Sequence, residues 1–169
     1  MQIVLTLLII AVTGLVIYAI IKTNPAKPMQ LPPMPATPYE PRLPQGAVAR
    51  HLSDGGRFLV EAVNESRYQP ALKALAGAHG DQPAAAPYVA TLVPDDLNPY
   101  ESAAVAVFLD GRMAGYLSQK AAVKFRENLK RDEIDGRVTT CDAQVRGGGL
   151  WQGKRLAYIV ALDMEVLEK

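Results

Sequence analysis

Tyrosines next to cationic, amide or carboxylate side chains occur at three places along the chain. The residues concerned are Arg67 and Tyr68, then Asn98, Tyr100 and Glu101, and finally Tyr116. Nucleobases stack on tyrosine faces, a guanidinium neutralises a phosphate, and an amide or carboxylate hydrogen-bonds a sugar hydroxyl or a base edge. The set therefore suits the end of a nucleic-acid strand, although burial in a protein core accounts for Tyr68 and Tyr116 equally well.

A second motif looks like a phosphate-binding loop but lacks two of its parts. Gly148, Gly153 and Lys154 have the spacing of a P-loop. Arg155 stands where Ser or Thr must hold magnesium, and the segment lies between two predicted strands instead of preceding a helix. Nucleotide hydrolysis is therefore not expected.

Other enzyme signatures are also missing from the sequence. The single Cys141 cannot form an intramolecular disulfide, and with His51 and His79 it does not make up the four ligands of a zinc site. No Ser-His-Asp, Cys-His or paired-carboxylate arrangement stands out. We predict that the protein is not an enzyme, with no catalytic residues, metal or cofactor.

The elements that must position the tyrosines are predicted within residues 57–169. Apolar and β-branched runs predict strands at 58–63, 88–93, 103–109, 112–117, 137–146 and 154–165, the last two joined by a glycine-rich loop at 147–153. Pro70 opens a short helix, and Ser118 caps another in which Ala122, Phe125 and Leu129 face inward.

Both alternating sets of residues 103–109 are apolar, so this strand should be central and covered on both faces. Asp110-Gly111 then predicts a tight hairpin. The predicted fold class is α+β, a small OB-like, partly open β-barrel with two short helices.

Two segments precede this domain. Residues 3–21 carry no charge and would form a helix about 28 Å long, which predicts a transmembrane anchor at 1–22 in contact with the lipid bilayer. An uncleaved anchor is favoured over a signal peptide because no Lys or Arg precedes the apolar run. Lys22 and Lys27 follow it, so the positive-inside rule predicts a single-pass protein with its domain in the cytoplasm.

The second segment, residues 23–56, is predicted to be a linker. Eight of the twenty residues from 25 to 44 are proline, which favours an extended polyproline II spacer. Residues 45–56 are expected to continue it as flexible chain. The whole chain has a formal charge of +1, whereas residues 57–169 hold 14 basic and 15 acidic side chains, a net charge of −1. Charge alone therefore does not indicate a nucleic-acid-binding protein.

Three blocks of the sequence resemble the HIRAN domain family. They are residues 66–75 (SRYQPALKAL), 92–107 (LVPDDLNPYESAAVAV) and 110–117 (DGRMAGYL). The family pattern has a small residue and a tyrosine before the first helix, an Asn-Pro-Tyr-Asp-x-Asn-Ala-Val-x-Val core, and a Gly-Tyr-Leu or Gly-His-Leu that ends a strand. The resemblance covers most of residues 57–129.

The resemblance implies a modified OB-like barrel that binds single-stranded DNA at a free 3′ end. Arg67 and Tyr68 match the family's phosphate and base contacts, Asn98 and Tyr100 match its end-binding loop, and Tyr116 matches the aromatic or histidine position. Glu101 stands where the family usually has Asp, and Ala103 where it usually has Asn. If that carboxylate receives the 3′-hydroxyl, Glu101 reaches one methylene too far, which weakens end specificity.

We therefore expect a membrane-anchored, HIRAN-like domain that binds nucleic acid, foremost single-stranded DNA. One alternative is a protein-interaction or structural module on the membrane without nucleic-acid binding, which the near-neutral domain charge favours. Another is an accessory part of a hydrolase acting on acid anhydrides. Because the sequence contains no translocase motor domain, a protein partner would have to supply the hydrolase activity.

Overall fold

The computed structural model describes residues 2–23 and 39–165. The chain divides into two units, Met1–Thr37 and Pro38–Lys169. The first unit contains the helix α1 (Gln2–Thr23). Among the described residues, no helix has both the length and the apolar character needed to cross a bilayer. The transmembrane prediction for residues 3–21 is therefore without support. Of the linker predicted at 23–56, residues 24–38 lie outside the described residues.

The second unit begins well before residue 57, where the sequence placed the start of the domain. Strand β1 (Arg50–Leu52) runs parallel to the start of β6 (Thr139–Gly147). This side of β6 is open there because β9 (Tyr158–Asp163) pairs only with the later part of β6, up to the pair Asp142–Asp163. Residues 45–56, predicted to be flexible, thus contain a strand of the sheet.

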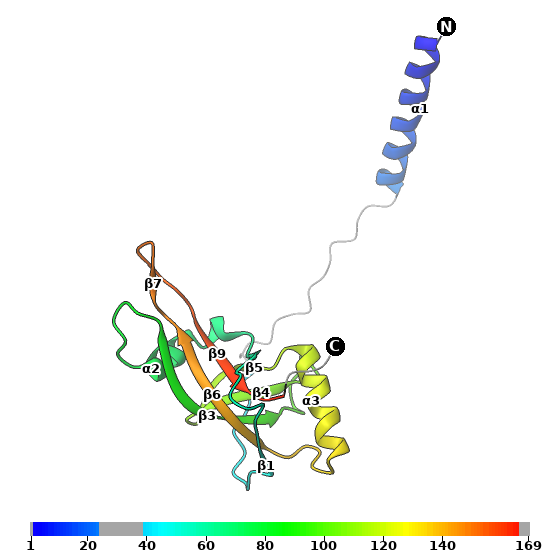
Figure 1. Cartoon of the computed structure of the whole chain (residues 1–169). Coiled ribbons are helices and arrows are strands. Elements are labelled where there is room, and N and C mark those ends of the chain that lie inside the picture. Colours follow the sequence, from blue (N-terminus) through cyan, green and yellow to red (C-terminus); the bar gives the residue numbers. More distant parts are fainter. Residues whose placement is uncertain (1, 24–38, 166–169) are drawn as a thin grey trace. The chain divides into compact units, whose positions relative to one another are not determined.

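The sheet has seven strands in the order β2-β9-β6-β3-β4-β5, with β1 beside β6. The remaining strands are β2 (Val60–Glu61), β3 (Ala84–Pro94), β4 (Val105–Leu109) and β5 (Arg112–Tyr116). Neighbours along this path are antiparallel, and the sheet curls into a half-barrel in which β3 and β6 are long and bent (Figure 1). The α+β prediction is confirmed.

The two ends of the curled sheet meet at one residue pair. Val63, just after β2, donates a backbone hydrogen bond to Tyr116 at the end of β5 (2.7 Å) and accepts one from it (3.0 Å). Gly115 permits this approach, because a Cβ at this position would lie 2.8 Å from the Val63 carbonyl oxygen. Any other residue would push the two segments apart.

The helices of the second unit follow the sequence signals. Helix α2 (Gln69–Ala76) has Pro70 in its first turn and ends at Gly77, whose φ is 68°. In helix α3 (Gln119–Arg131), the Ser118 hydroxyl caps the first turn by accepting a hydrogen bond from the Ala121 amide at 3.3 Å. Ala122, Phe125 and Leu129 are buried, as predicted.

Strand β4 is buried at every position, as its apolar pattern predicts. It is an interior strand of the sheet, paired with β3 on one side and β5 on the other, although β6 and β3 occupy the middle of the path. Curling of the sheet, together with side chains packed on its outer face, covers both sides of the strand. The Asp110-Gly111 turn has φ values of 47° and 73°, as a tight hairpin requires.

The glycine-rich loop predicted at 147–153 contains a small hairpin. Strands β7 (Leu150–Trp151) and β8 (Lys154–Arg155) form a separate two-stranded sheet. Leu150, Trp151 and the following Leu156 are exposed. The hairpin is thus an apolar and cationic projection from the half-barrel.

Candidate functional site

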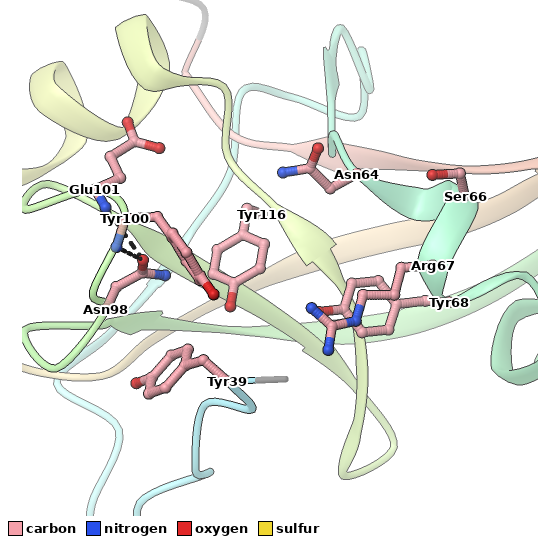
Figure 2. Close-up of a pocket in the computed structure, with 9 residues that line it drawn as sticks. All are labelled: Tyr39, Asn64, Ser66, Arg67, Tyr68, Asn98, Tyr100, Glu101 and Tyr116. Atoms are coloured by element: carbon pink, nitrogen blue, oxygen red, sulfur yellow. Dashed lines mark hydrogen bonds between the residues drawn. The ribbon is translucent and has the colours of Figure 1, made fainter. Parts of the chain in front are cut away.

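The six tyrosine-associated residues predicted from the sequence line one pocket of about 290 Å³. Arg67 and Tyr68 come from the segment before α2, Asn98, Tyr100 and Glu101 from the loop between β3 and β4, and Tyr116 from the end of β5. Figure 2 shows these side chains with three further lining residues, Tyr39, Asn64 and Ser66. Tyr68 and Tyr116 are half-buried, so neither is a fully enclosed core residue.

A short 3-10 helix, η1 (Glu65–Arg67), presents Arg67 to the pocket. It begins after Asn64, which has a left-handed backbone conformation (φ 65°). The Arg67 guanidinium is exposed, makes no hydrogen bond or ion pair within the described residues, and extends toward the tyrosines (Figure 2). It is therefore free to contact an anion.

Gln69 fixes η1 and the start of α2 to the sheet. Its side-chain amide donates to the carbonyls of Glu65 (3.1 Å) and Tyr158 (2.8 Å), while its amide oxygen accepts from the Tyr158 backbone at 2.9 Å. Because Gln69 directly follows Tyr68, these bonds hold that ring at a fixed place above the sheet.

A β-bulge positions Tyr116. The pairing of β4 with β5 shifts between Val107 and Phe108, so that Val107 opposes Gly115 and Phe108 opposes Met113. A shift of one residue changes which face of a sheet a side chain occupies. The bulge, together with the backbone pair to Val63, therefore sets the direction of the Tyr116 ring.

Asn98 uses its side chain to shape the loop at 95–104. Its amide oxygen accepts from the backbone amides of Tyr100 (3.0 Å) and Glu101 (3.2 Å), and its amide nitrogen donates to Asp95 at 3.2 Å. These contacts occupy both acceptor sites of the oxygen and one of the two donor hydrogens. Asn98 is thus largely a loop-forming residue, with one N–H left for a ligand.

Arg126 of α3 holds the same loop from outside the pocket. Its guanidinium donates to the carbonyls of Ala103 (3.1 Å) and Ala104 (2.9 Å) and to the Asp96 carboxylate (2.6 Å). The loop is thereby fixed at both ends, and Tyr100 projects from it with 66% of its surface exposed. An exposed ring on a rigid loop is a suitable stacking surface.

The pocket keeps its phenols neutral. Burial raises the pKa of Tyr68 and of Tyr116, and the nearby Asp95 carboxylate raises both further. A neutral phenol donates a hydrogen bond without repelling a phosphate. The rings can therefore stand beside an anionic ligand over the whole physiological pH range.

Glu101 contributes an unsatisfied carboxylate oxygen. Within the described residues, its Oε1 atom is buried and has no hydrogen-bond partner. Leaving such an acceptor unpaired costs about 1–3 kcal/mol. In Figure 2 the Glu101 side chain extends away from the tyrosine rings, so it forms an edge of the pocket and does not face its centre.

Tyr39 is a pocket residue that the sequence reasoning missed, because it lies in the proline-rich stretch that was interpreted as a spacer. Its hydroxyl donates to Asp95 Oδ1 at 2.5 Å. Burial and this hydrogen bond raise the pKa of Tyr39 to about 12. The Tyr-Glu-Pro sequence around it gives no local signal, since the contact joins residues far apart in the chain.

The described residues contain no group of three or more His, Cys, Asp or Glu side chains able to hold a metal ion. The residues that line the pocket can offer stacking on tyrosine, anion pairing with arginine and hydrogen bonding. Comparisons of the chain with protein-family models, curated proteins and solved structures find no match.

Proposed function

We propose that the second unit is a HIRAN-like domain, with an OB-like half-barrel, that binds single-stranded DNA. The observation that carries the proposal is the convergence of six residues, from three separated blocks of the family-like sequence, on one pocket. The blocks are separate in the sequence. Their meeting at one place is what a shared binding task would require.

The chemistry of the pocket supports a single strand over a duplex. Tyr100 offers an exposed ring on which an unpaired base can stack, and Arg67 offers an unpaired guanidinium to a phosphate. Tyr68 and Tyr116 supply neutral hydroxyls, and the remaining N–H of Asn98 can donate to a base or sugar. Stacking on tyrosine requires unstacked bases, which only a single strand presents freely.

Glu101 is the residue of the pocket that concerns recognition of the 3′ end of the strand. The unpaired Oε1 of Glu101 suits a hydroxyl donor, as the resemblance implies for a 3′-hydroxyl. However, the side chain is longer than the Asp of the family and extends away from the rings. We therefore propose that the protein distinguishes a 3′-hydroxyl from a 3′-phosphate less sharply than family members with Asp.

A titration of a fluorescent single strand with the full-length chain tests the proposal. We expect saturable binding that weakens steeply with salt. Tyr100→Ala should weaken it by about 1–3 kcal/mol with little sequence dependence, because every base has a π face. Arg67→Ala should reduce the salt slope by roughly one phosphate contact.

Two matched controls accompany these variants. Trp151 is 63% exposed, a fraction similar to the 66% of Tyr100, but it does not line the pocket. Arg112 is an exposed arginine that also lies outside the lining. Trp151→Ala and Arg112→Ala should bind as the wild type does. Absence of saturable binding at low salt, or equal losses in the controls, would reject the proposal.

A protein-interaction role is the second candidate, and the β7–β8 hairpin favours it. The exposed Leu150, Trp151 and Leu156 form an apolar surface next to Lys154, a composition common in protein interfaces. A protein partner whose binding is lost in Trp151→Ala but kept in Tyr68→Ala and Tyr100→Ala would support this role. A hydrolase activity found with that partner would belong to the partner.

A further inference from the structure

We propose that the segment 39–42 (Tyr39-Glu40-Pro41-Arg42) forms a second wall of the binding site, in which Tyr39 stacks on a base and Arg42 contacts a phosphate. This inference rests on the proposed binding of single-stranded DNA. It extends the site beyond the three family-like blocks to a segment that the sequence assigned to the linker.

The position of Tyr39 is the first support. It lines the same pocket as Tyr100 and Tyr116, and its hydroxyl is bonded to Asp95 Oδ1. The other oxygen of Asp95 accepts from the Asn98 side chain. Asp95 is only 6% exposed, so a single buried carboxylate holds both the segment and the tyrosine-bearing loop. In Figure 2 the Tyr39 ring lies on the side of the pocket toward which the hydroxyl ends of Tyr100 and Tyr116 point.

The charges of the segment are the second support. Arg42 is exposed and, within the described residues, makes no hydrogen bond or ion pair. Its positive charge lies close enough to Tyr39 to lower the pKa of that phenol against the effect of burial. The Glu40 carboxylate in turn raises the pKa of Tyr68, after the larger effect of burial.

Two Tyr–Arg pairs from distant parts of the chain thus contribute to the proposed site. Arg67, Tyr68 and Tyr39 line the pocket, and Arg42 follows Tyr39 three residues later in the chain. A base that enters between the walls has aromatic surface available on more than one side, and its flanking phosphates meet a cation from each wall.

The opposite possibility is that Tyr39 fills the space that a base would take. In that arrangement the segment would compete with the ligand, and removing the ring would strengthen binding. Weaker binding by Tyr39→Ala would therefore indicate that Tyr39 contacts the base, and tighter binding would indicate that Tyr39 occupies the place of the base.

The test is a fluorescence-anisotropy titration of the full-length chain with a labelled oligothymidylate. Tyr39→Ala should weaken binding about 5- to 100-fold, as expected for loss of one stacking ring. Tyr39→Phe keeps the ring and loses the bond to Asp95, so a smaller loss of a few fold is expected. Arg42→Ala should lower the salt slope by roughly one phosphate contact, while Arg112→Ala leaves it unchanged.

The outcomes separate this inference from the function on which it rests. If the wild type binds no single strand, both proposals fail. If the wild type binds and Tyr100→Ala weakens it, but Tyr39→Ala binds equally well or more tightly, only the second wall is rejected. Thermal unfolding of each variant checks that the fold is intact, and Tyr39→Phe provides a test that preserves packing.

Discussion

Two buried carboxylates, Asp163 and Asp95, each hold a part of the N-terminal segment to the sheet, but with different donors. Asp163, 2% exposed, accepts from the Ser53 hydroxyl at 2.5 Å, the Gly56 amide at 2.8 Å and the Asp54 amide at 3.3 Å. All three donors belong to one turn that follows β1. Asp95, 6% exposed, accepts from two side chains, those of Tyr39 and Asn98.

The difference separates a structural contact from one at the proposed binding site. Two of the three donors to Asp163 are backbone amides, which cannot move away without unfolding the turn, so these bonds contribute chiefly to stability. Side-chain donors rotate at small cost, so the bonds to Asp95 can rearrange when a ligand enters. A buried carboxylate is therefore informative about function only when the nature of its donors is known.

The largest expected effect comes from removing the structural carboxylate. Asp163→Ala leaves the Ser53 hydroxyl and two backbone amides without an acceptor, which should lower the free energy of unfolding by about 3 kcal/mol or more. Urea unfolding followed by circular dichroism measures the loss. The control is Asp142→Ala, since Asp142 pairs with Asp163 across the strands but has an exposed side chain. A similar loss in both variants would contradict the assigned role.

Ionisation of Asp163 should also make the stability of the fold depend on pH. Hydrogen bonds, first that from Ser53 and then those from Asp54 and Gly56, lower the pKa of Asp163 to about 2, from an ordinary value of 3.8. Because the folded-state pKa is the lower one, the stabilisation is present above about pH 4 and is lost as the pH falls toward 2. The loss amounts to about 2 kcal/mol.

Urea unfolding of the wild type and of Asp163→Asn at a series of pH values isolates this contribution. Arg50 lowers the pKa of Asp132, so Asp132 also contributes to the pH dependence of stability. Subtracting the stability of Asp163→Asn from that of the wild type at each pH removes this contribution. The stability difference between the two proteins should shrink over the interval from about pH 4 to pH 2. A constant difference would show that the charge of Asp163 is not the cause.

The smallest effect on stability is expected at the other carboxylate. In Asp95→Asn the Tyr39 hydroxyl can rotate to meet the new amide, so unfolding should become easier by only about 1 kcal/mol. Single-strand binding should nevertheless weaken several-fold, because Tyr39 and the loop are no longer held by one charged acceptor. Both the free energy of unfolding and the affinity for a single strand should be measured on Asp95→Asn. A loss of stability as large as that of Asp163→Ala would show that the two carboxylates do not differ in role.

Local signals predicted much of the second unit. Helix α3 has its cap at Ser118 and its three inward positions within one segment, and the Asp110-Gly111 turn needs only two adjacent residues. The family-like blocks likewise identified the six pocket residues, although the loop-forming part played by Asn98 was not visible before its partners were placed. These features depend on neighbours in sequence or on a motif.

Other features depend on contacts between distant residues and could not be predicted. Strand β1 is three residues long and exists because β6 has a free side where β9 ends. Tyr39 is fixed by Asp95, which lies 56 residues later. The β7–β8 hairpin was concealed by glycines that favour a loop in any local interpretation.

The pair Val63–Tyr116 has a consequence for when the pocket exists. Tyr116 places its ring in the pocket and its backbone in the contact that joins the two ends of the curled sheet. When that contact opens, Arg67 and Tyr68, which follow Val63 closely, separate from Tyr116. Opening of the barrel and loss of the pocket are thus one event. A bound strand, which stabilises only the closed state, must slow amide hydrogen exchange at Val63 even though Val63 does not line the pocket.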